Sequence, residues 1–316
     1  MTLFNSVDLR SDHLMMTHEL VAAGYDDKAI ARMRKAGELH RLRHGAYTFG
    51  AHWADLDQVG RRQLVALATL RSARVPVALT GPSAGDSFGV PVWDMGEEVH
   101  LARVDQRAGR REGGKAQHRG VLLAEDITVR DGIPLTSGTR TAIEMIMLAD
   151  TEHALVTVNG LLHADETTVP LLERRLAGMS QVPETLNAPI VLALADGRCE
   201  SAGETRVLWL CWSQHLPAPE PQYRIRNRGG RTIARVDFAW PGLKTYLEFD
   251  GKEKYLRYRR PGETVADAVI REKNREALIC GLTGWRCIRI VWADLFYPER
   301  TAARILATLN GQLWAA

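Results

Sequence analysis

Cysteine is scarce in this 316-residue chain, and long apolar runs are missing from it. The four cysteines form no CxxC pair and have no histidine at zinc-ligand spacing, so they predict reduced thiols rather than disulfides or structural zinc. No run approaches the roughly 18 apolar residues of a membrane span, and the first 20 residues lack a signal-peptide core. The sequence therefore predicts an intracellular, cytoplasmic protein with no membrane partner.

A large net charge is missing too, because the formal charge is only +3. Any electrostatic attraction to nucleic acid must therefore come from local patches. Hydrophobic content of 45% and charged content of 25% are ordinary for a globular protein. The length allows two or three domains. We expect a mixed α+β and α/β multidomain protein with domains at residues 1–52, 53–185 and 186–316.

The N-terminal segment predicts a winged helix-turn-helix. A short helix begins at Thr17 and ends at Gly24, and an aspartate, Asp26 or Asp27, caps a second helix. A mixed apolar and basic segment broken by a His-Gly pair follows and predicts a two-stranded wing. Helix, tight turn, helix and basic hairpin form the layout of this DNA-binding motif.

Basic residues are concentrated in this segment, with six Lys/Arg and one acid between Lys28 and Arg43. We expect the second helix to present cations to a DNA groove. The wing would present two arginines to phosphates, because residues two apart on a strand share a face. A small helical subdomain with a solvated basic face is the alternative. The candidate DNA-binding residues are Arg32, Arg34, Lys35, Arg41 and Arg43.

The segment ending in RLRHGAYTF resembles, over about residues 8–50, the winged-helix domain of AbiEi-type antitoxins and related regulators. AbiEi-like proteins also carry the pattern TS..RT before a helix in the segment that follows, here Thr136-Ser137 and Arg140-Thr141. The resemblance implies binding to double-stranded DNA and a cognate toxin or other operon partner. A homodimer on two half-sites would be in keeping with it.

The middle of the chain predicts scaffolding elements without a catalytic constellation. Residues 57–73 predict a helix and residues 97–104 a strand, and we find no histidine pair suited to a metal. Residues 106–120 carry five Lys/Arg against one acid and predict a mobile basic loop. Residues 151–185 predict two helices, the second capped by Thr167.

The most informative stretch runs from Arg235 to Tyr255 and reads RVDFAWPGLKTYLEFDGKEKY. Two runs of β-formers flank a turn at Pro241-Gly242 and predict a hairpin, with Asp237 on one strand and Glu248 and Asp250 on one face of the other. Acids beside a core are rarely unpaired. Carboxylates with a lysine suit Mg²⁺ or Mn²⁺, the lysine helping to orient a water. A surface hairpin with solvated acids is the alternative.

Asp237, then Glu248-Phe249-Asp250-Gly251 and Lys254-Tyr255, resembles the hairpin of PD-(D/E)XK nucleases, most closely the very-short-patch-repair-like branch. The resemblance extends over about Glu200 to Leu309. ESAGETRVLWL matches the first helix with its acid, and REKNREALICGLTGWRCIRIVWADL matches the helix, Gly-Trp turn, strand and final segment. It implies a restriction-endonuclease-like mixed sheet and metal-dependent hydrolysis of phosphodiesters. This sequence departs from the family's pattern at two positions. Asp250 stands where the superfamily has a lysine, and Lys254 stands where the branch has a histidine.

The resemblance assigns roles to individual residues of this domain. Glu200 is the alternative to Glu204 because the two share a helix face, and Lys273 is a further candidate for the cation. Asp237, Glu248 and Glu204 would hold the metal ion. The catalytic candidates are Glu204, Asp237, Glu248, Asp250, Lys252 and Lys254.

Before the hairpin, RIRNRGGRTIAR places five arginines in twelve residues without an acid. Arginine forks pair well with phosphate, so this run predicts a rim that follows a nucleic-acid backbone, with Arg226, Arg228 and Arg231 as candidates. An edge hairpin guarded by arginine is the alternative.

Three functions follow from these features. The first is a metal-dependent DNA endonuclease guided by a winged helix. The second is an AbiEi-type antitoxin that represses its operon, with an inactive nuclease-like domain. The third is a nuclease directed at RNA, since the sequence does not separate DNA from RNA.

Overall fold

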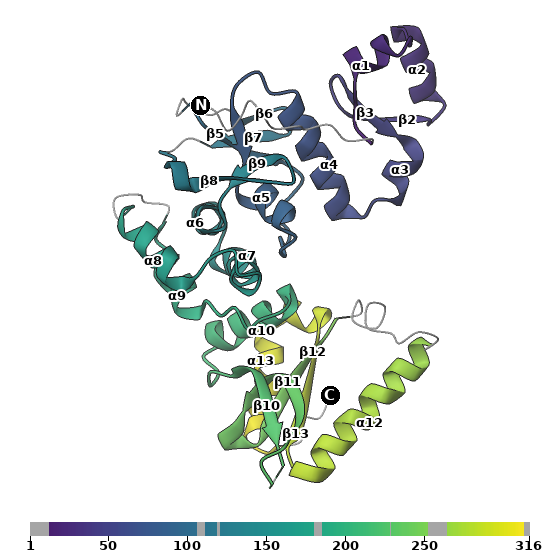
Figure 1. Cartoon of the computed structure of the whole chain (residues 1–316). Coiled ribbons are helices and arrows are strands. Elements are labelled where there is room, and N and C mark those ends of the chain that lie inside the picture. The colour runs from purple at the N-terminus through teal and green to yellow at the C-terminus, as the bar shows by residue number, and fades with distance from the viewer. Residues whose placement is uncertain are drawn as a thin grey trace. The chain divides into compact units, whose positions relative to one another are not determined.

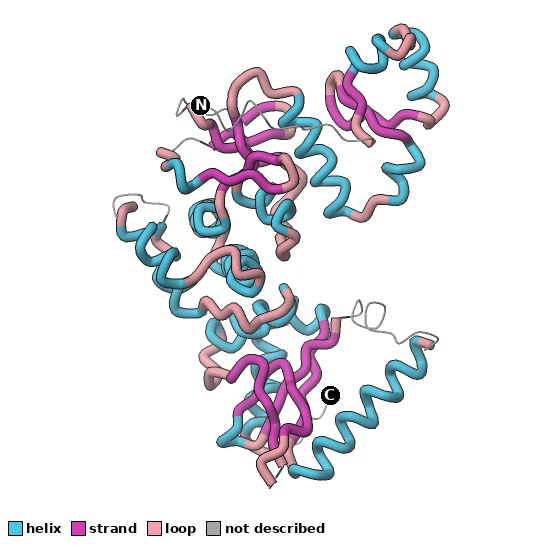
Figure 2. Tube along the Cα trace, viewed as in Figure 1, coloured by secondary structure: helices cyan, strands magenta, loops and turns pink. Residues whose placement is uncertain are grey.

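A computed structural model of the chain describes residues 13–105, 111–118, 121–179, 185–227, 229–251 and 264–312 (Figures 1 and 2). The chain divides into two compact units, Met1–Leu192 and Ala193–Ala316. Within these described ranges, helices alternate with the strands of three sheets, which confirms the expected mixed α+β multidomain class. In the described part of the chain, no helix is both long enough and apolar enough to cross a bilayer.

The first unit begins with a small module, called here the N-terminal module, in which a three-stranded sheet of order β1-β3-β2 carries two helices. The Asp26 carboxylate accepts a hydrogen bond of 2.7 Å from the Ala29 amide and so caps the second helix. Gly24 (φ 95°) and Gly37 (φ 76°) end the two helices in the left-handed region, as the sequence predicts. Its elements are β1 (Met15–Met16), α1 (Thr17–Ala22), α2 (Asp27–Lys35), β2 (Leu39–Arg43) and β3 (Ala46–Phe49).

Two helices follow the module, α3 (Gly50–Asp55) and α4 (Gln58–Arg71), and α4 shares its core. Leu64 and Ala68 of α4 are buried in one cluster with Leu14, Met16 and Ala46. The Arg71 side chain also donates to the Leu14 carbonyl at 3.1 Å and pairs with Glu19. In Figure 1, α4 extends from the module to the six-stranded sheet.

The rest of the first unit is built on a six-stranded sheet of order β6-β7-β5-β4-β9-β8. The pairs β4–β9 and β5–β7 are parallel, and the other neighbours are antiparallel. Its elements are β4 (Val77–Leu79), α5 (Gly81–Phe88), β5 (Val99–Arg103), β6 (Arg111–Glu112), β7 (Lys115–His118), η1 (Ala124–Asp126), β8 (Ile127–Arg130), β9 (Ile133–Thr136), α6 (Gly138–Leu148), α7 (Thr151–His163), α8 (Val169–Ala177) and α9 (Ala188–Leu194).

The TS..RT pattern joins β9 to α6. The Ser137 hydroxyl accepts a hydrogen bond from the Arg140 amide and caps the helix, while the hydroxyls of Thr136 and Thr141 lie 2.8 Å apart. The Arg140 guanidinium is buried and donates to the Glu144 carboxylate at 2.8 Å. Each polar residue of the pattern therefore has a structural partner within this unit.

The predicted mobile loop at residues 106–120 is wrong for its described part. Residues 111–118 form the antiparallel pair β6–β7, and Arg111 pairs with Glu98. Gly113 and Gly114, with φ of 58° and 73°, supply the two-residue turn that antiparallel strands favour. The other residues of this segment lie outside the described ranges.

The cap of α8 also differs from the prediction by one residue. Thr168, rather than Thr167, accepts a hydrogen bond from the Leu171 amide at 3.4 Å. The Thr167 hydroxyl instead lies 2.8 Å from that of Thr139, so it connects α8 to α6.

The second unit has one four-stranded sheet of order β10-β11-β12-β13. The first three strands run antiparallel, whereas β13 is parallel to β12 and is reached through the long helix α12. Figures 1 and 2 show α12 lying alongside this sheet. Its elements are α10 (Ala202–Ser213), β10 (Glu220–Arg226), β11 (Thr232–Trp240), η3 (Pro241–Leu243), β12 (Thr245–Asp250), α12 (Val265–Thr283), β13 (Arg286–Val291), η4 (Trp292–Phe296) and α13 (Pro298–Leu309).

Each face of this sheet has its own core. Leu247 and Phe249 of β12 pack with residues of α10 and α13, whereas Tyr246 packs on the other face with Ile279 of α12. Helix α10 lies so close to β12 that a Cβ atom on Gly203 would be 2.0 Å from Phe249 Cε1. Glycine is therefore required where α10 crosses the strand.

Candidate nucleic-acid interface

The outer surface of α2 carries cations without acidic partners. Lys28, Arg32, Arg34 and Lys35 are all exposed, and they make no ion pair within the described residues. Lys28 and Arg32 are four residues apart on one helix face, where like charges are unfavourable. Several arginines elsewhere in the unit are, by contrast, paired with carboxylates: Arg62 with Asp86, Arg71 with Glu19, Arg130 with Glu166 and Arg175 with Asp126.

A hollow of about 470 Å³ lies between α2 and β2 and is open to solvent. Three cationic side chains line it, and no acid does. Arg34 and Lys35 come from α2, and Arg41 comes from the strand, so helix and strand contribute to one basic surface. Its remaining lining residues are Ala31, Leu39 and His40.

The two arginines of the wing do not share a face, so that prediction is wrong. Arg41 pairs with Tyr47 across the ladder and Arg43 with Ala46, which leaves Leu42 as an extra residue. Such a bulge turns the strand, and cross-strand partners share a face, so Arg41 lies on the Tyr47 side and Arg43 on the Ala46 side. The alternation rule fails here because it assumes an unbroken ladder.

The two arginines also differ in environment. Arg41 is exposed and holds the turn by donating to the Arg43 carbonyl at 3.2 Å and contacting His44 Nδ1 at 3.1 Å. Arg43 is half-buried, burial lowers the pKa of its guanidinium, and its Nε has no hydrogen-bond partner among the residues described. Arg41 is the better placed of the two to meet a phosphate.

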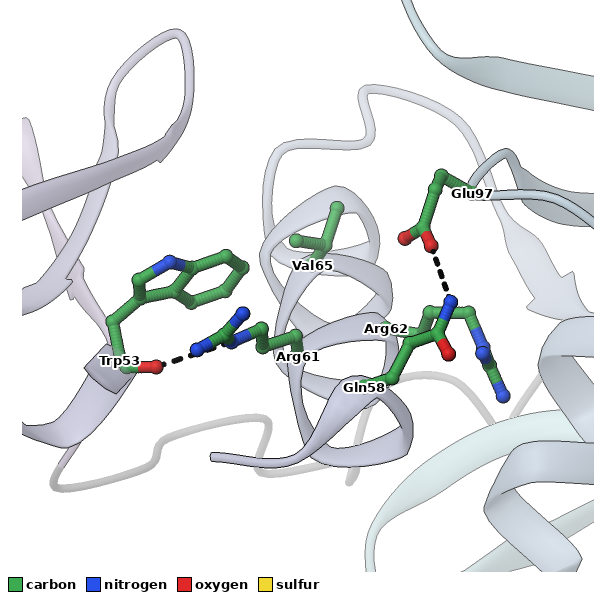
Figure 3. Close-up of a pocket in the computed structure, with 6 residues that line it drawn as sticks. All are labelled: Trp53, Gln58, Arg61, Arg62, Val65 and Glu97. Atoms are coloured by element: carbon green, nitrogen blue, oxygen red, sulfur yellow. Dashed lines mark hydrogen bonds between the residues drawn. The ribbon is translucent and has the colours of Figure 1, made fainter. Parts of the chain in front are cut away.

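A second hollow, of about 450 Å³, lies between α3 and α4 and is drawn in Figure 3. The Arg61 guanidinium donates to the Trp53 carbonyl at 3.2 Å and lies over the Trp53 ring, 5.2 Å from its centroid. Gln58 donates to Glu97 at 3.0 Å across the hollow. His40 of β2 also stacks on the Trp53 ring, with 4.2 Å between the ring centroids. These contacts connect α3 and α4 to the strand that borders the basic hollow.

In the second unit, two of the predicted metal ligands lie on adjacent strands. Phe238 and Leu247 are cross-strand partners; Asp237 directly precedes Phe238 on β11 and Glu248 directly follows Leu247 on β12, and both acids are buried. The Asp237 carboxylate accepts a hydrogen bond of 2.8 Å from the Phe249 amide, and Glu248 pairs with Arg275 of α12.

The other two acids are held by separate partners. Glu204 is 2% exposed and accepts hydrogen bonds from Ser201 Oγ at 2.8 Å, from the Glu200 amide at 3.0 Å and from Gln222 Nε2 at 2.8 Å. The Asp250 carboxylate lies 3.7 Å from the Arg289 guanidinium.

Over the described ranges, no group of three or more histidine, cysteine, aspartate or glutamate side chains is arranged to hold a metal ion. Lys252, Lys254 and Arg228 lie outside the described residues, as does the side chain of Lys273. The metal site stays a prediction.

The sequence reasoning missed Arg275 as the cation beside Glu248. Arg275 lies four residues before Ile279, which packs on the sheet, so both fall on one face of α12. Helical spacing counted back from Ile279 would have directed Arg275 toward Glu248. Its guanidinium also donates to the Arg235 carbonyl at 3.4 Å and so connects α12 to β11.

Two curated proteins of Mycobacterium tuberculosis resemble most of this chain. They are "Uncharacterized protein Rv2248" of strain ATCC 25618 / H37Rv and "Uncharacterized protein MT2308" of strain CDC 1551 / Oshkosh. Each is 32% identical over 284 residues, which cover 87% of this chain and 94% of the relative. The chain belongs to the same family as these two proteins.

A family model described as "Transcriptional regulator, AbiEi antitoxin" matches residues 17–50 of this Rv2248-family chain. The match spans α1, α2, β2 and β3, and it supports the AbiEi-type reading of the N-terminal module. It does not extend to the second unit, so it leaves the nuclease-like reading unsupported. A crystal structure of the RV2827C protein from M. tuberculosis is 16% identical with a TM-score of 0.38, covering 57% of this chain and 76% of its own. A likeness at that TM-score assigns neither fold nor function.

Proposed function

We propose that this chain is a cytoplasmic DNA-binding transcriptional regulator of the AbiEi antitoxin type, with the N-terminal module as a winged helix. The observation that carries the proposal is the set of exposed cations on α2, which have no acidic partner in the described structure and lie within the segment that the AbiEi model matches. Cations left unpaired on one surface are the electrostatic footprint of a protein that binds phosphates.

In this proposal α2 enters the major groove, where Arg32, Arg34 and Lys35 contact the phosphates that border the groove, and Arg41 of the wing contacts the backbone beside them. The stack of His40, Trp53 and Arg61 keeps β2 in place beside α2. A homodimer would place two such modules on two half-sites, and a toxin or other product of the same operon would be the protein partner.

The test is binding of the full chain to a labelled duplex from the promoter region of its own operon, followed by fluorescence anisotropy at several salt concentrations. Replacing Arg32, Arg34 and Lys35 together by alanine should reduce the slope of log K against log salt by about 3, because each phosphate contact contributes about 0.9. Arg174→Ala, which removes an exposed cation of α8, is the control and should leave the slope unchanged. A triple variant that binds like the wild type would contradict the proposal.

A metal-dependent nuclease is the second candidate, because the second unit contains a helix with a buried acid, a hairpin, a second helix and a strand in the order that the very-short-patch-repair-like branch requires. Incubation with plasmid plus Mg²⁺ or Mn²⁺, beside Asp237→Ala, separates the two candidates. Cleavage that disappears in the variant supports the nuclease, and binding without cleavage in either sample supports the regulator. A parallel assay on RNA tests the RNA-directed alternative.

A further inference from the structure

The hairpin β10–β11 at the edge of the second unit's sheet places arginines directly opposite one another. Arg224 of β10 is the cross-strand partner of Arg235 of β11. Like charges at such positions destabilise a sheet, because the side chains lie about 5 Å apart. Arg226 and Arg231 are close by, since Arg226 pairs with Thr232, the residue after Arg231.

The side chains of Arg224, Arg226 and Arg235 lie on the face turned away from α12. Tyr223 and Ile225 of β10 pack into the core that contains Ile279, so their neighbours in the strand, Arg224 and Arg226, point to the opposite face. Arg224, Arg226 and Arg231 are exposed, and the side chain of Arg235 is 54% exposed. Arg224, Arg226 and Arg235 therefore share one solvent-facing surface of the hairpin, and Arg231 is exposed at its turn.

Among the described residues, one acid compensates this surface. Glu200, in the loop before α10, pairs with Arg235 through bonds of 2.7 and 3.3 Å. Arg226 donates to the Gly230 carbonyl at 3.3 Å, an interaction within the turn that neutralises no charge. No ion pair of Arg224 or Arg231 occurs within the part of the chain that is described, so most of the positive charge is uncompensated.

Protection of a sheet edge accounts for only part of this arrangement. Charged residues on an edge strand prevent pairing with another chain, and Arg224 and Arg226 on β10 would serve that purpose. Arg235, however, lies on β11, which has neighbours on both sides. The segment from Glu220 to Trp240 also contains arginine but no lysine. Arginine's planar fork suits phosphate oxygens, and the proposed DNA-binding function of the N-terminal module favours nucleic acid as the partner.

We propose that this hairpin is a second phosphate-binding surface for DNA, centred on Arg224 and Arg235, and that Glu200 is its internal counter-ion. DNA phosphate replaces the Glu200 carboxylate on Arg235 when the complex forms. The inference rests on the proposed DNA-binding function and adds contacts that do not depend on sequence, because arginine reads the backbone rather than base edges. It predicts opposite effects for two substitutions at one surface.

The experiment measures the affinity of the full chain for two labelled duplexes, one from its own promoter region and one of unrelated sequence. Arg224→Glu should weaken binding to both by about tenfold, and the loss should shrink as salt rises. Glu200→Ala should tighten binding to both by about threefold, since it releases Arg235. Lys244→Glu and Glu220→Ala, exposed residues at the other end of these strands, make the same charge changes as controls and should have little effect.

The possible results separate this inference from the proposed function. A wild-type chain that binds neither duplex overturns both. Binding that depends on α2 but is equal in Arg224→Glu and Lys244→Glu overturns the inference alone, as does a Glu200→Ala variant that binds no more tightly than Glu220→Ala. If circular dichroism shows that Arg224→Glu does not fold, the Glu200→Ala result alone tests the inference, because this substitution leaves the edge strand intact.

Discussion

At the scale of single residues, Gly50 begins α3 where a side chain has no room. A Cβ atom there would lie 1.9 Å from the Gly37 carbonyl oxygen. The Gly50 amide also donates to the Glu38 carbonyl at 2.8 Å, so the backbone of α3 is held against the turn after α2. Two glycines thus allow the chain to pass itself closely beside the basic surface.

Replacing Gly50 by alanine should lower the free energy of unfolding by about 1–3 kcal/mol, because either the backbone or its neighbour must move. Urea unfolding followed by circular dichroism measures this change. Gly281→Ala in α12 is the control, since nothing lies within 4 Å of its added Cβ. The control should be neutral or slightly more stable, because alanine is the better helix former. Equal stability of the two variants would show that the crowding at Gly50 is relieved without cost.

The buried ion pair of Arg140 is a second feature at this scale. The side chains of Arg140 and Glu144 are 3% and 4% exposed, and the Asp126 carboxylate lies 3.9 Å from the same guanidinium. Although burial raises the pKa of Asp126, the hydrogen bond from Arg175 holds it below the ordinary value. Removing Arg140 would therefore leave the buried Glu144 carboxylate without the cation that pairs with it, while Asp126 keeps its pair with Arg175.

Arg140→Met should lower the free energy of unfolding by about 3–5 kcal/mol, as expected when one partner of a buried pair is removed. Arg130→Met is the matched control, because its pair with Glu166 is 42% and 28% exposed. Exposed pairs contribute about 1 kcal/mol or less. Denaturant midpoints of the two variants give the comparison, and a control as destabilised as Arg140→Met would contradict the reasoning.

At the scale of elements, local chemistry allowed several boundaries to be predicted. Asp26 and Gly24 fix helix ends through bonds and dihedral angles within a few residues, so the sequence alone contains the information. The bulge beside Arg41 could not be predicted in this way, because register depends on the partner strand. The strands in residues 111–118 were missed for a related reason: β7, the second of them, pairs with β5, which is a tertiary contact.

The acids of the second unit also have some features that the local sequence predicts and others that depend on tertiary contacts. Their burial was foreseen from the apolar β-formers around Asp237 and Glu248, and both are buried. The partners of these acids come from other elements, Arg275 from α12 and the Phe249 amide from the neighbouring strand. A pattern within one strand predicts which face a side chain takes. It does not predict which group from a distant helix will meet it there.

The histidines of β5 and β7 give this sheet a dependence on pH. His100 Nδ1 lies 2.9 Å from His118 Nε2, and no such pair was foreseen from the sequence. Burial, and then the charge of His118, lower the pKa of His100 to about 4, and burial lowers that of His118. The charged groups facing them are Glu98, Arg111 and Glu144. Both rings are therefore neutral at pH 7.

The pKa of His100 in the folded chain is below its unfolded value of about 6.5. Between these two pKa values, the unfolded chain therefore binds more protons than the folded chain. The contribution of His100 to the free energy of unfolding is fully present above pH 6.5 and is lost as pH falls toward 4. The loss is about 3 kcal/mol. Urea unfolding of the wild type and of His100→Gln between pH 7.5 and 4 measures it. The variant should lose less stability across this range, and parallel losses in the two proteins would contradict the prediction.

At the scale of the whole molecule, the two compact units carry separate hydrophobic cores. The clusters around Ile30 and Leu64 belong to Met1–Leu192, whereas those around Phe238 and Tyr246 belong to Ala193–Ala316. A unit with its own core can unfold as a cooperative unit of its own. The proposed winged helix and the arginine hairpin would thus be supported by different cores, so that a substitution can weaken one without the other.

Two substitutions test this division. Arg140→Met removes a buried pair in the first unit, and Gly203→Ala adds a Cβ that would lie 2.0 Å from Phe249 Cε1 in the second. We expect calorimetry to resolve two unfolding transitions, with Arg140→Met lowering one midpoint and Gly203→Ala lowering the other by an amount equivalent to about 1–3 kcal/mol. The α2 variants, which change only exposed side chains, should move neither midpoint and so serve as controls. If both substitutions instead shift one common transition, the two cores unfold together. The two DNA-binding surfaces would then lose their structure together.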